Sequence, residues 1–444
     1  MTQPPPPAEP RAAGTAEQEV AEICHTLIRI DTSNYGDGSG PGERKAAEYV
    51  AGLLGDVGLQ PVVLESAPGR ASVVVRIAGA DPGRPGLLVH GHLDVVPARA
   101  EDWTLPPFAA EERDDCLWGR GAVDMKDMDA MILACVRAML RSGRRPPRDL
   151  VLAFTADEEA GGRAGAHWLI DHHRDLFDGV GEAVSEVGGF CVNVGDRRVY
   201  LMQTAEKGIL WLRLVARGRA GHGSQINDDN AVTRLAAAVA RIGAHRWPRE
   251  VTPTVRLFLD GMSQLSGTTL HPDDPAGLEA VLGTTARWVG ATLQNTANPT
   301  ALQAGYKQNV IPGTATALID CRFLPGREEE ALATVAELAG PDVDVEVLLR
   351  DIALEAPTTG AVLDAMQAAL QGEDPQAHVL PYCLSGGTDN KAYARIGVRG
   401  YGFVPLRLPP GLDFAGMFHG VDERVPLEAL RFGTRVLGRF LETC

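Results

Sequence analysis

The stretch Leu87-Leu88-Val89-His90-Gly91-His92-Leu93-Asp94-Val95-Val96-Pro97 predicts a buried strand that ends in polar side chains. His92 and Asp94 stand two positions apart, and side chains repeat every second residue along a strand, so both lie on one face. Asp94 can therefore accept a hydrogen bond from the imidazole of His92 and fix its ring, as proteins do when a histidine holds a metal. A polar pair without a metal has the same pattern, so this stretch alone leaves both interpretations open.

Apolar runs and helical patterns alternate on both sides of this strand. The apolar, β-branched runs cover residues 61–64, 72–77, 87–90 and 149–155. The helical patterns cover residues 20–28, 46–54 and 126–140, each with an apolar stripe at helical spacing. Strands that are apolar throughout and alternate with helices predict an α/β sheet covered on both faces.

The pattern changes after about residue 205. A strand, a helix, two strands, a helix and a strand follow one another, which predicts a small α+β domain inserted into the first one. These elements are expected at residues 208–216, 230–244, 301–306, 314–323, 328–339 and 343–349. From about residue 353 helical patterns and apolar strand runs alternate again, and a last helix begins at Pro426. We expect this segment to rejoin the first sheet.

Composition narrows the class of function. The chain has 444 residues, with 42 basic and 58 acidic side chains and a formal charge of −16, which argues against a nucleic-acid surface. It contains no run of the roughly 18 to 20 apolar residues that a membrane span needs, so no membrane partner is expected. Residues 1–14 are rich in Pro and Ala and predict a disordered tail, not a signal peptide, so we expect a cytoplasmic protein. The seven cysteines form no CxxC pair, which suits reduced thiols.

Four further acidic or histidine-containing motifs accompany the first one. Asp124 stands before a helical pattern, three carboxylates at 157–159 close a buried run, Glu186 lies beside glycines, and His419 precedes the last helix. Each has an ordinary explanation when taken singly, such as a helix cap or a solvated loop. Jointly they form a nitrogen and oxygen ligand set suited to zinc and, less selectively, to cobalt or manganese. Since no cysteine takes part, the site is expected to be catalytic.

Two other enzyme classes fit the sequence less well. A glycosidase needs two carboxyl groups that face each other across a sugar, roughly 5 to 9.5 Å apart, and the adjacent Glu158 and Glu159 serve that poorly. A nucleotide-dependent enzyme would show GxGxxG after a first strand or GxxxxGK[ST], and neither motif occurs.

Together the motifs resemble those of the co-catalytic di-zinc hydrolases, which include aminoacylase, carboxypeptidase G, acetylornithine deacetylase and succinyl-diaminopimelate desuccinylase. The matching segments are His92-Leu-Asp-Val-Val-Pro, Gly119-Arg-Gly-Ala-Val-Asp-Met-Lys, Asp157-Glu-Glu-Ala-Gly-Gly, Glu186 and His419-Gly-Val-Asp-Glu. The resemblance runs from about residue 18 to the C-terminus. It implies a zinc-peptidase-like catalytic domain with a mixed sheet, at 15–205 and 353–444, and a ferredoxin-like lid and dimerisation domain at 206–352.

The resemblance also implies a role for each residue. Two Zn²⁺ ions, for which Co²⁺ or Mn²⁺ are possible substitutes, would share Asp124 as a bridging ligand; His92 and Glu186 would complete one site and Glu159 and His419 the other. Glu158 would act as the general base on a water that bridges the metals. Asp94 would orient His92, and the peptide after Asp124 is often cis in this family.

Residues of the lid are implied to meet the substrate. His222 matches a histidine that reaches the partner subunit's active site and stabilises the oxyanion, so a homodimer through the lid is expected. Asn309 and Arg322 match residues that bind the substrate's carboxylate. Gly386, Gly387 and Thr388 match a turn whose amides and hydroxyl can hold the same group.

The predicted function is hydrolysis of an amide in an N-acyl amino acid or short peptide with a free carboxylate. A dipeptidase or carboxypeptidase is the alternative to a deacylase, and the long segment at 261–298 favours the aminoacylase and dipeptidase-like members. A non-catalytic relative is disfavoured because no expected ligand is lost. The sequence departs from the common pattern at Asp127, Val187, Gln225-Ile226-Asn227 and Lys391, which affects substrate recognition more than the metal ligands.

Overall fold

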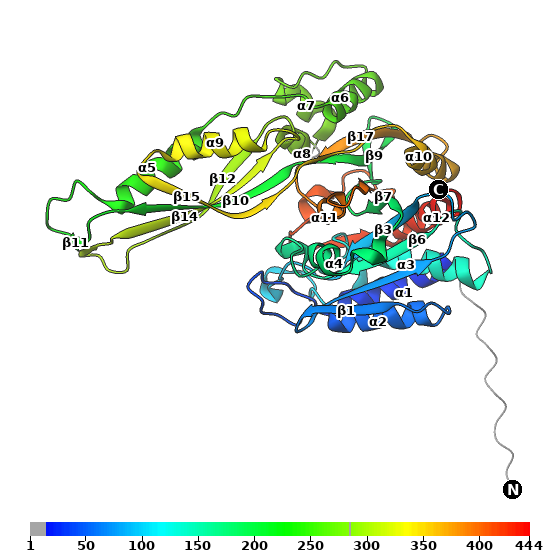
Figure 1. Ribbon diagram of the computed structural model, residues 1–444. Coiled ribbons are helices and arrows are strands. Elements are labelled where there is room, and N and C mark those ends of the chain that lie inside the picture. Colours follow the sequence, from blue (N-terminus) through cyan, green and yellow to red (C-terminus); the bar gives the residue numbers. More distant parts are fainter. Residues whose placement is uncertain (1–14, 284–285) are drawn as a thin grey trace, which may run out of the picture. The chain divides into compact units, whose positions relative to one another are not determined.

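The computed structural model describes residues 15–283 and 286–444, which form two compact units (Figure 1). The first unit contains the described residues up to Cys191 together with Thr359–Ala377 and Arg395–Cys444. The second contains Val192–Thr358 and His378–Ala394. The predicted tail at 1–14 lies outside the described residues, and the domain boundaries expected from the sequence stay a prediction.

A mixed sheet organises the first unit. Its strands lie in the order β1-β2-β6-β3-β7-β18; β1, β2 and β6 pair antiparallel, whereas β6, β3, β7 and β18 run parallel. Their bounds are β1 Val62–Ala67, β2 Arg70–Ile77, β3 Gly86–His92, β6 Leu150–Thr155, β7 Val180–Ser185 and β18 Arg399–Gly402. Every residue of β3 and β6 is buried, as the continuous apolar runs predicted. A small sheet of β4 Glu111–Arg113, β5 Cys116–Trp118 and β19 Arg424–Pro426 joins distant segments.

Helices of this unit pack against one another and against the sheet (Figure 1). Helix α3, Lys126–Arg141, packs on β3 and contacts both α1, Ala16–Arg29, and α12, Leu427–Thr443. The predicted stripe of α1 is confirmed, since Val20, Ile23, Cys24, Leu27 and Ile28 are buried. The remaining helices are α2 Arg44–Gly55, α4 Ala166–His172 and α10 Ala361–Glu373.

The second unit contains the predicted α+β motif. Strands β10 Gly208–Arg217, β12 Thr296–Ala304, β14 Thr314–Phe323 and β15 Val343–Asp351 form an antiparallel sheet in the order β12-β14-β10-β15. Helices α5 Ala231–Ala244 and α9 Glu328–Ala339 pack on one face, where Leu212, Leu235 and Val335 share a core. Asn230 begins α5, because its side chain accepts from the amides of Val232 and Thr233. The order strand-helix-strand-strand-helix-strand is therefore confirmed.

The second unit contains further elements, of which β8, β16 and β17 pair with β9 outside the sheet of this motif. The bounds of these elements are β8 Cys191–Val194, β9 Arg197–Glu206, β11 Gly221–His222, β13 Val310–Ile311, β16 Leu354–Glu355, β17 His378–Leu384, α6 Pro253–Ser266, α7 Pro275–Leu282, α8 Ala286–Ala291 and α11 Asn390–Ala394.

The strand expected at 301–306 begins earlier, at Thr296, and runs through Pro299. A proline is accommodated there because β12 is an edge strand, whose outer side needs no amide donor. Among the described residues, none of the helices is both long and apolar enough to span a membrane.

Candidate metal centre

The carboxyl ends of three parallel strands bring the predicted ligands together in the first unit. His92 is the last residue of β3, Glu158 and Glu159 follow β6 in a short 3₁₀ turn, and Glu186 follows β7. β3 and β6 are in register at their ends, with His92 opposite Thr155. Functional side chains commonly collect at this edge of an open α/β sheet.

The first group consists of His92, Asp124 and Glu186, all buried. His92 Nε2 lies 3.1 Å from Asp124 Oδ1 and 3.5 Å from Glu186 Oε2. The opposite ring nitrogen, Nδ1, lies 2.9 Å from the backbone oxygen of Asp94. Since a carbonyl oxygen only accepts, Nδ1 carries the proton, and the lone pair of a neutral ring is on Nε2, which faces the two carboxylates.

The second group consists of Asp124, Glu159 and His419. His419 Nε2 lies 2.9 Å from Glu159 Oε2 and 3.4 Å from Asp124 Oδ2. Asp124 thus directs one oxygen to each histidine. Its peptide bond to Met125 is cis, as the resemblance led us to expect.

Both groups have the donors and spacing that a divalent cation needs. In each group the three ligand atoms lie within 4.8 Å of one another. Two ligands about 2.1 Å from a tetrahedral metal are about 3.4 Å apart, which is close to the 3.1–3.5 Å found in the first group. Nitrogen and oxygen donors without sulfur suit zinc, cobalt or manganese. The residues therefore fit two adjacent metal ions that share Asp124.

Glu158 belongs to neither group. Its Oε2 lies 3.9 Å from His92 Nε2, and its side chain is 15% exposed. A carboxylate beside the groups but outside them can exchange protons with solvent or substrate.

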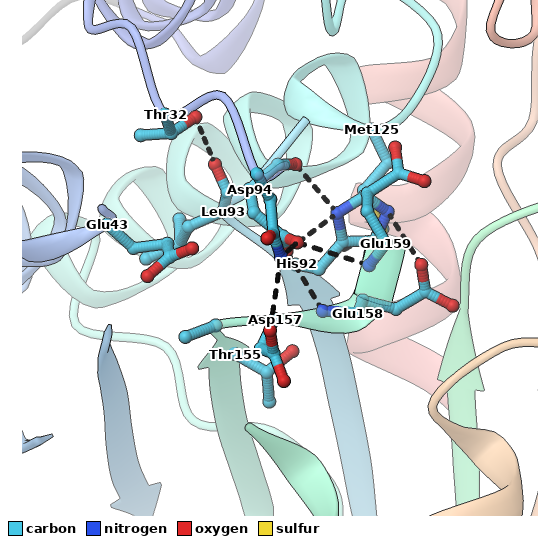
Figure 2. Close-up of polar contacts among 12 residues, drawn as sticks. Thr32, Glu43, His92, Leu93, Asp94, Met125, Thr155, Asp157, Glu158 and Glu159 are labelled. Atoms are coloured by element: carbon cyan, nitrogen blue, oxygen red, sulfur yellow. Dashed lines mark hydrogen bonds and ion pairs between the residues drawn. The ribbon is translucent and has the colours of Figure 1, made fainter. Parts of the chain in front are cut away.

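The Asp94 carboxylate organises the turn that carries Glu158 and Glu159 (Figure 2). Its Oδ1 accepts from the backbone amide of Glu158 and its Oδ2 from that of Glu159, each at 3.1 Å. The distance from Asp94 Oδ1 to His92 Nδ1 is 3.5 Å, longer than the contact that the backbone oxygen makes. The expected role of Asp94 is therefore divided between two parts of the residue. Its backbone oxygen makes the shorter contact that orients His92, and its carboxylate mainly holds the turn that carries Glu158 and Glu159.

Asn34, which no sequence motif predicted, links Asp94 to a buried ion pair. The Asn34 amide donates to Asp94 Oδ2 at 2.9 Å and to Asp157 Oδ1 at 3.1 Å, while its oxygen accepts from Arg70. Arg70 also pairs with the fully buried Glu43. Only the short polar run at 31–34 signals this contact in the sequence, and such runs are common in loops.

Burial and opposite charges together shift the ionisation of the site. Burial would lower the pKa of His92, but Glu186, Asp124 and Asp94 outweigh it and raise that pKa well above its usual value. Hydrogen bonds to Asp124 and Glu159 raise the pKa of His419 to about 10. Burial raises the pKa of Glu186 to about 8. Burial also acts to raise the pKa of Asp124, but hydrogen bonds from His419 and His92 prevail and hold it well below the ordinary range.

Two of the predicted substrate residues in the second unit are already engaged by neighbouring side chains. Arg322 forms a two-point contact with Asp320, at 2.6 and 3.1 Å. The amide and hydroxyl of Thr388 donate to the buried Glu206, at 3.0 and 2.6 Å. Lys391, one of the departures from the family pattern, also contacts Glu206, at 3.2 Å. Nothing in the sequence near Glu206 signals this role.

His222 and Asn309 lie together at the other end of the second unit's sheet. The β11–β13 ribbon pairs His222 with Val310, and the amide of Gly223 donates to the oxygen of Asn309 at 2.9 Å. The ribbon adjoins the Arg217–Thr314 end of the sheet, whereas Arg322 lies opposite Ile209. The strand between these positions is about 26 Å long at about 3.3 Å per residue. Gly387 lies near Ile209, because an added Cβ would be 3.1 Å from its side chain.

Comparisons with known proteins agree on one family. The sequence profile of peptidase family M20/M25/M40 matches residues 88–443. The N-fatty-acyl-amino acid synthase/hydrolase PM20D1 of Mus musculus is 28% identical, over 89% of this chain and 81% of its own. Aminoacylase-1 of Homo sapiens is 28% identical, over 89% of this chain and 88% of its own. Among solved structures, the M20 family metallo-carboxypeptidase Sso-CP2 from Sulfolobus solfataricus has a TM-score of 0.74 at 17% identity, covering 96% of this chain and 99% of that one.

Proposed function

The chain belongs to peptidase family M20/M25/M40, whose members hydrolyse amide bonds with metal ions, and on that premise we propose the reaction, substrate and residue roles that follow. The substrate is an N-acyl amino acid or short peptide with a free carboxylate. The observation that carries the proposal is the placement of Asp124, whose two oxygens face the two histidines at 3.1 and 3.4 Å.

Asp124 would bridge two metal ions. His92 and Glu186 would complete one site, and Glu159 and His419 the other, with zinc as the natural choice for this donor set and Co²⁺ or Mn²⁺ as substitutes. Two bound cations would supply Lewis acidity, which lowers the pKa of a water between them and polarises the amide carbonyl.

Glu158 performs the proton transfers in this proposal. Its carboxylate stands beside both groups without belonging to either, so it can take a proton from the attacking water and deliver it to the leaving amine. The backbone amides of Glu158 and Glu159 donate hydrogen bonds to the Asp94 carboxylate, which fix the turn and hence the direction of the base. His222 would stabilise the oxyanion that forms on the substrate carbonyl.

The names of the relatives favour an acyl amino acid over a peptide. The mouse relative is named for N-fatty-acyl-amino acids and the human one for aminoacylase activity. A dipeptidase or carboxypeptidase stays the second candidate, which is supported by the structural neighbour from Sulfolobus solfataricus, named as a metallo-carboxypeptidase. A cytoplasmic location also stays a prediction.

The substrate's carboxylate would meet the end of the second unit that holds Arg322 and the turn at 386–388. Glu206 accepts hydrogen bonds from both donors of Thr388. We therefore assign Thr388 to shaping the turn, and we assign carboxylate binding to the amides of Gly386 and Gly387. Arg322 would exchange its contact with Asp320 for the substrate.

A homodimer explains how His222 and Asn309 could serve the same substrate as Arg322. Within one chain they stand about 26 Å from it along the sheet. A second copy would supply them in trans. The edge strand β12 is open for pairing and exposes Leu302, which is 54% accessible.

A substrate panel tests the function. The chain loaded with zinc, cobalt or manganese is incubated with N-acetyl and longer N-acyl amino acids and with dipeptides, each beside its C-terminal amide. We expect cleavage of the free acids only. Glu158→Gln should lower kcat about 10² to 10⁴-fold while both metals still bind.

Glu182→Gln is the control, because it makes the same carboxylate-to-carboxamide change at a partly buried residue of the first unit that is a member of neither group. Turnover of Glu158→Gln within about tenfold of the unaltered chain would show that another group is the base. An unaltered chain that cleaves nothing with any of the metals would favour a non-catalytic relative.

A further inference from the structure

Glu423 is a fully buried carboxylate on which several donors of one loop converge. Its Oε1 accepts from the amides of Val123, at 2.7 Å, and Asp124, at 3.1 Å. Its Oε2 accepts from the amide of Gly121, at 2.9 Å, and from Arg120 Nη1, at 2.7 Å. The loop that presents Asp124 thus wraps around a side chain that lies about 300 residues further along the chain.

The same residue anchors the loop that carries His419. The backbone oxygen of Glu423 accepts from the amide of Gly119 at 2.9 Å. Arg120 donates from Nη2 to the oxygen of Gly420, at 2.8 Å, in addition to its bond with Glu423. Arg120, in the loop at 119–124, therefore donates to the loop that carries His419, and Glu423, in that second loop, accepts from the first.

The loop at 119–124 has no helix or strand to satisfy its buried amides. Gly121 has a φ of +87°, and an added Cβ would lie 2.9 Å from the side chains of Val95 and Lys126, so the backbone passes close to its neighbours. A buried amide without an acceptor destabilises the folded chain. Glu423 is the acceptor for three such amides, one of them that of Asp124 itself.

We infer that Glu423 is a positioning residue, which sets the separation of Asp124 and His419 and thereby the metal affinity of the second group. The inference rests on the proposed metal-dependent function. It follows from the geometry: two of the three residues in the group depend on Glu423 or its loop, and the contact that results is 3.4 Å between Asp124 Oδ2 and His419 Nε2.

Zinc titration of Glu423→Gln tests this inference. A carboxamide offers one oxygen and turns an NH₂ group toward backbone donors, so it cannot accept all three amides. Residues outside the ligand set that orient ligands typically change metal affinity 10 to 100-fold. We expect the zinc-binding step assigned to Glu159 and His419 to weaken by about that factor, and the step assigned to His92 and Glu186 to change less.

The measurement uses the whole chain and a competing chromophoric chelator, with no substrate present, so its outcome is independent of whether the proposed reaction occurs. Circular dichroism and a urea midpoint of the metal-free chain report the fold. Glu182→Gln, the same change at a partly buried carboxylate that pairs with Arg148 of this unit, should bind both zinc ions as the unaltered chain does. If Glu423→Gln does not fold, Glu423→Asp, which keeps the charge but is shorter by one methylene, replaces it.

Two results overturn the inference. One is a folded Glu423→Gln or Glu423→Asp chain that binds both zinc ions with unaltered affinity. The other is loss of the folded signal in both variants, because Glu423 would then support the whole unit and not the second group in particular.

Discussion

Asp94 contacts both His92, at the end of β3, and the turn that carries Glu158 and Glu159. Its carboxylate accepts the amides of Glu158 and Glu159, and its backbone oxygen orients His92. Asp94→Ala removes the first two contacts and leaves the third in place. We therefore expect zinc affinity to fall about 10 to 100-fold and kcat to fall even at saturating zinc, since the turn that directs Glu158 loses its acceptor.

Chelator competition and steady-state kinetics at several zinc concentrations check this. Asp37→Ala is the control, because Asp37 lies on an exposed turn of the same unit and its side chain accepts hydrogen bonds from the amide and hydroxyl of Ser39. Full recovery of kcat at high zinc would contradict a role of Asp94 in directing the base.

The two histidines predict a proton release on metal binding. The pKa of His419 is about 10, against an ordinary value of 6.5, and that of His92 is also raised well above 6.5. Both rings are therefore protonated in the metal-free chain at pH 7, and so is most of Glu186, whose pKa is about 8. Zinc must therefore displace roughly two to three protons. The affinity for zinc should therefore fall as the pH is lowered. Calorimetry in buffers of different ionisation enthalpy measures how many protons are released. Equal heats in all buffers would contradict this.

The same shifts fix the sign of the pH effect on the metal-free fold. A raised folded-state pKa means that the imidazolium–carboxylate contacts stabilise the chain fully below pH 6.5, the unfolded value. This stabilisation is lost as the pH rises through about 10.

The sequence predicts which residues gather but not which residues hold them. His92 ends an apolar strand, and Glu159 and Glu186 follow two others. Parallel strand ends meet at one edge, so the proximity of these residues can be foreseen. Glu423 and Asn34 act through contacts with segments that are distant in the sequence. No local pattern distinguishes a carboxylate that accepts buried amides from one that faces solvent.

At the level of elements, β3 and α3 depend on a close approach at Gly91. An added Cβ would lie 2.2 Å from Asp129 Oδ1 and 2.9 Å from Met125 Cε. Both atoms belong to the segment that begins α3 and follows Asp124. Gly91→Ala should therefore push α3 away from the strand and destabilise the fold by about 1–3 kcal/mol.

Urea unfolding measures this, with Gly52→Ala in α2 as the control. An added Cβ at Gly52 meets nothing within 4 Å, and alanine favours a helix, so that variant should be as stable as the unaltered chain or slightly more stable. A Gly91→Ala chain of unaltered stability would mean that Asp129 moves aside freely.

Elements with a clean period are the ones that the sequence predicts well. The stripe of α1 and the apolar run of β6 appear where the pattern places them. Strand β12 begins at Thr296, before the expected 301–306. It includes Pro299, which a strand tolerates at the edge of a sheet, and the neighbouring strands decide whether it lies at an edge.

At the level of the whole molecule, the dimer proposal predicts complementation between two inactive variants. Co-expressed His222→Ala and Glu158→Gln chains would form mixed dimers in which one site has both an intact base and the partner's intact histidine. Statistical mixing gives about a quarter of the unaltered activity. Each variant alone should be inactive or strongly impaired, and light scattering should show the dimer. A mixture no more active than its components would place His222 in cis or outside the reaction.

The discontinuity of the first unit has a consequence for the order in which the centre is built. His92, Asp124 and Glu186 are all synthesised before the second unit begins, whereas His419 follows it. At roughly 5–20 residues per second, the approximately 230 residues between Glu186 and His419 take about 10–50 s to translate. During that interval the nascent chain already holds one complete ligand group and lacks the last member of the other.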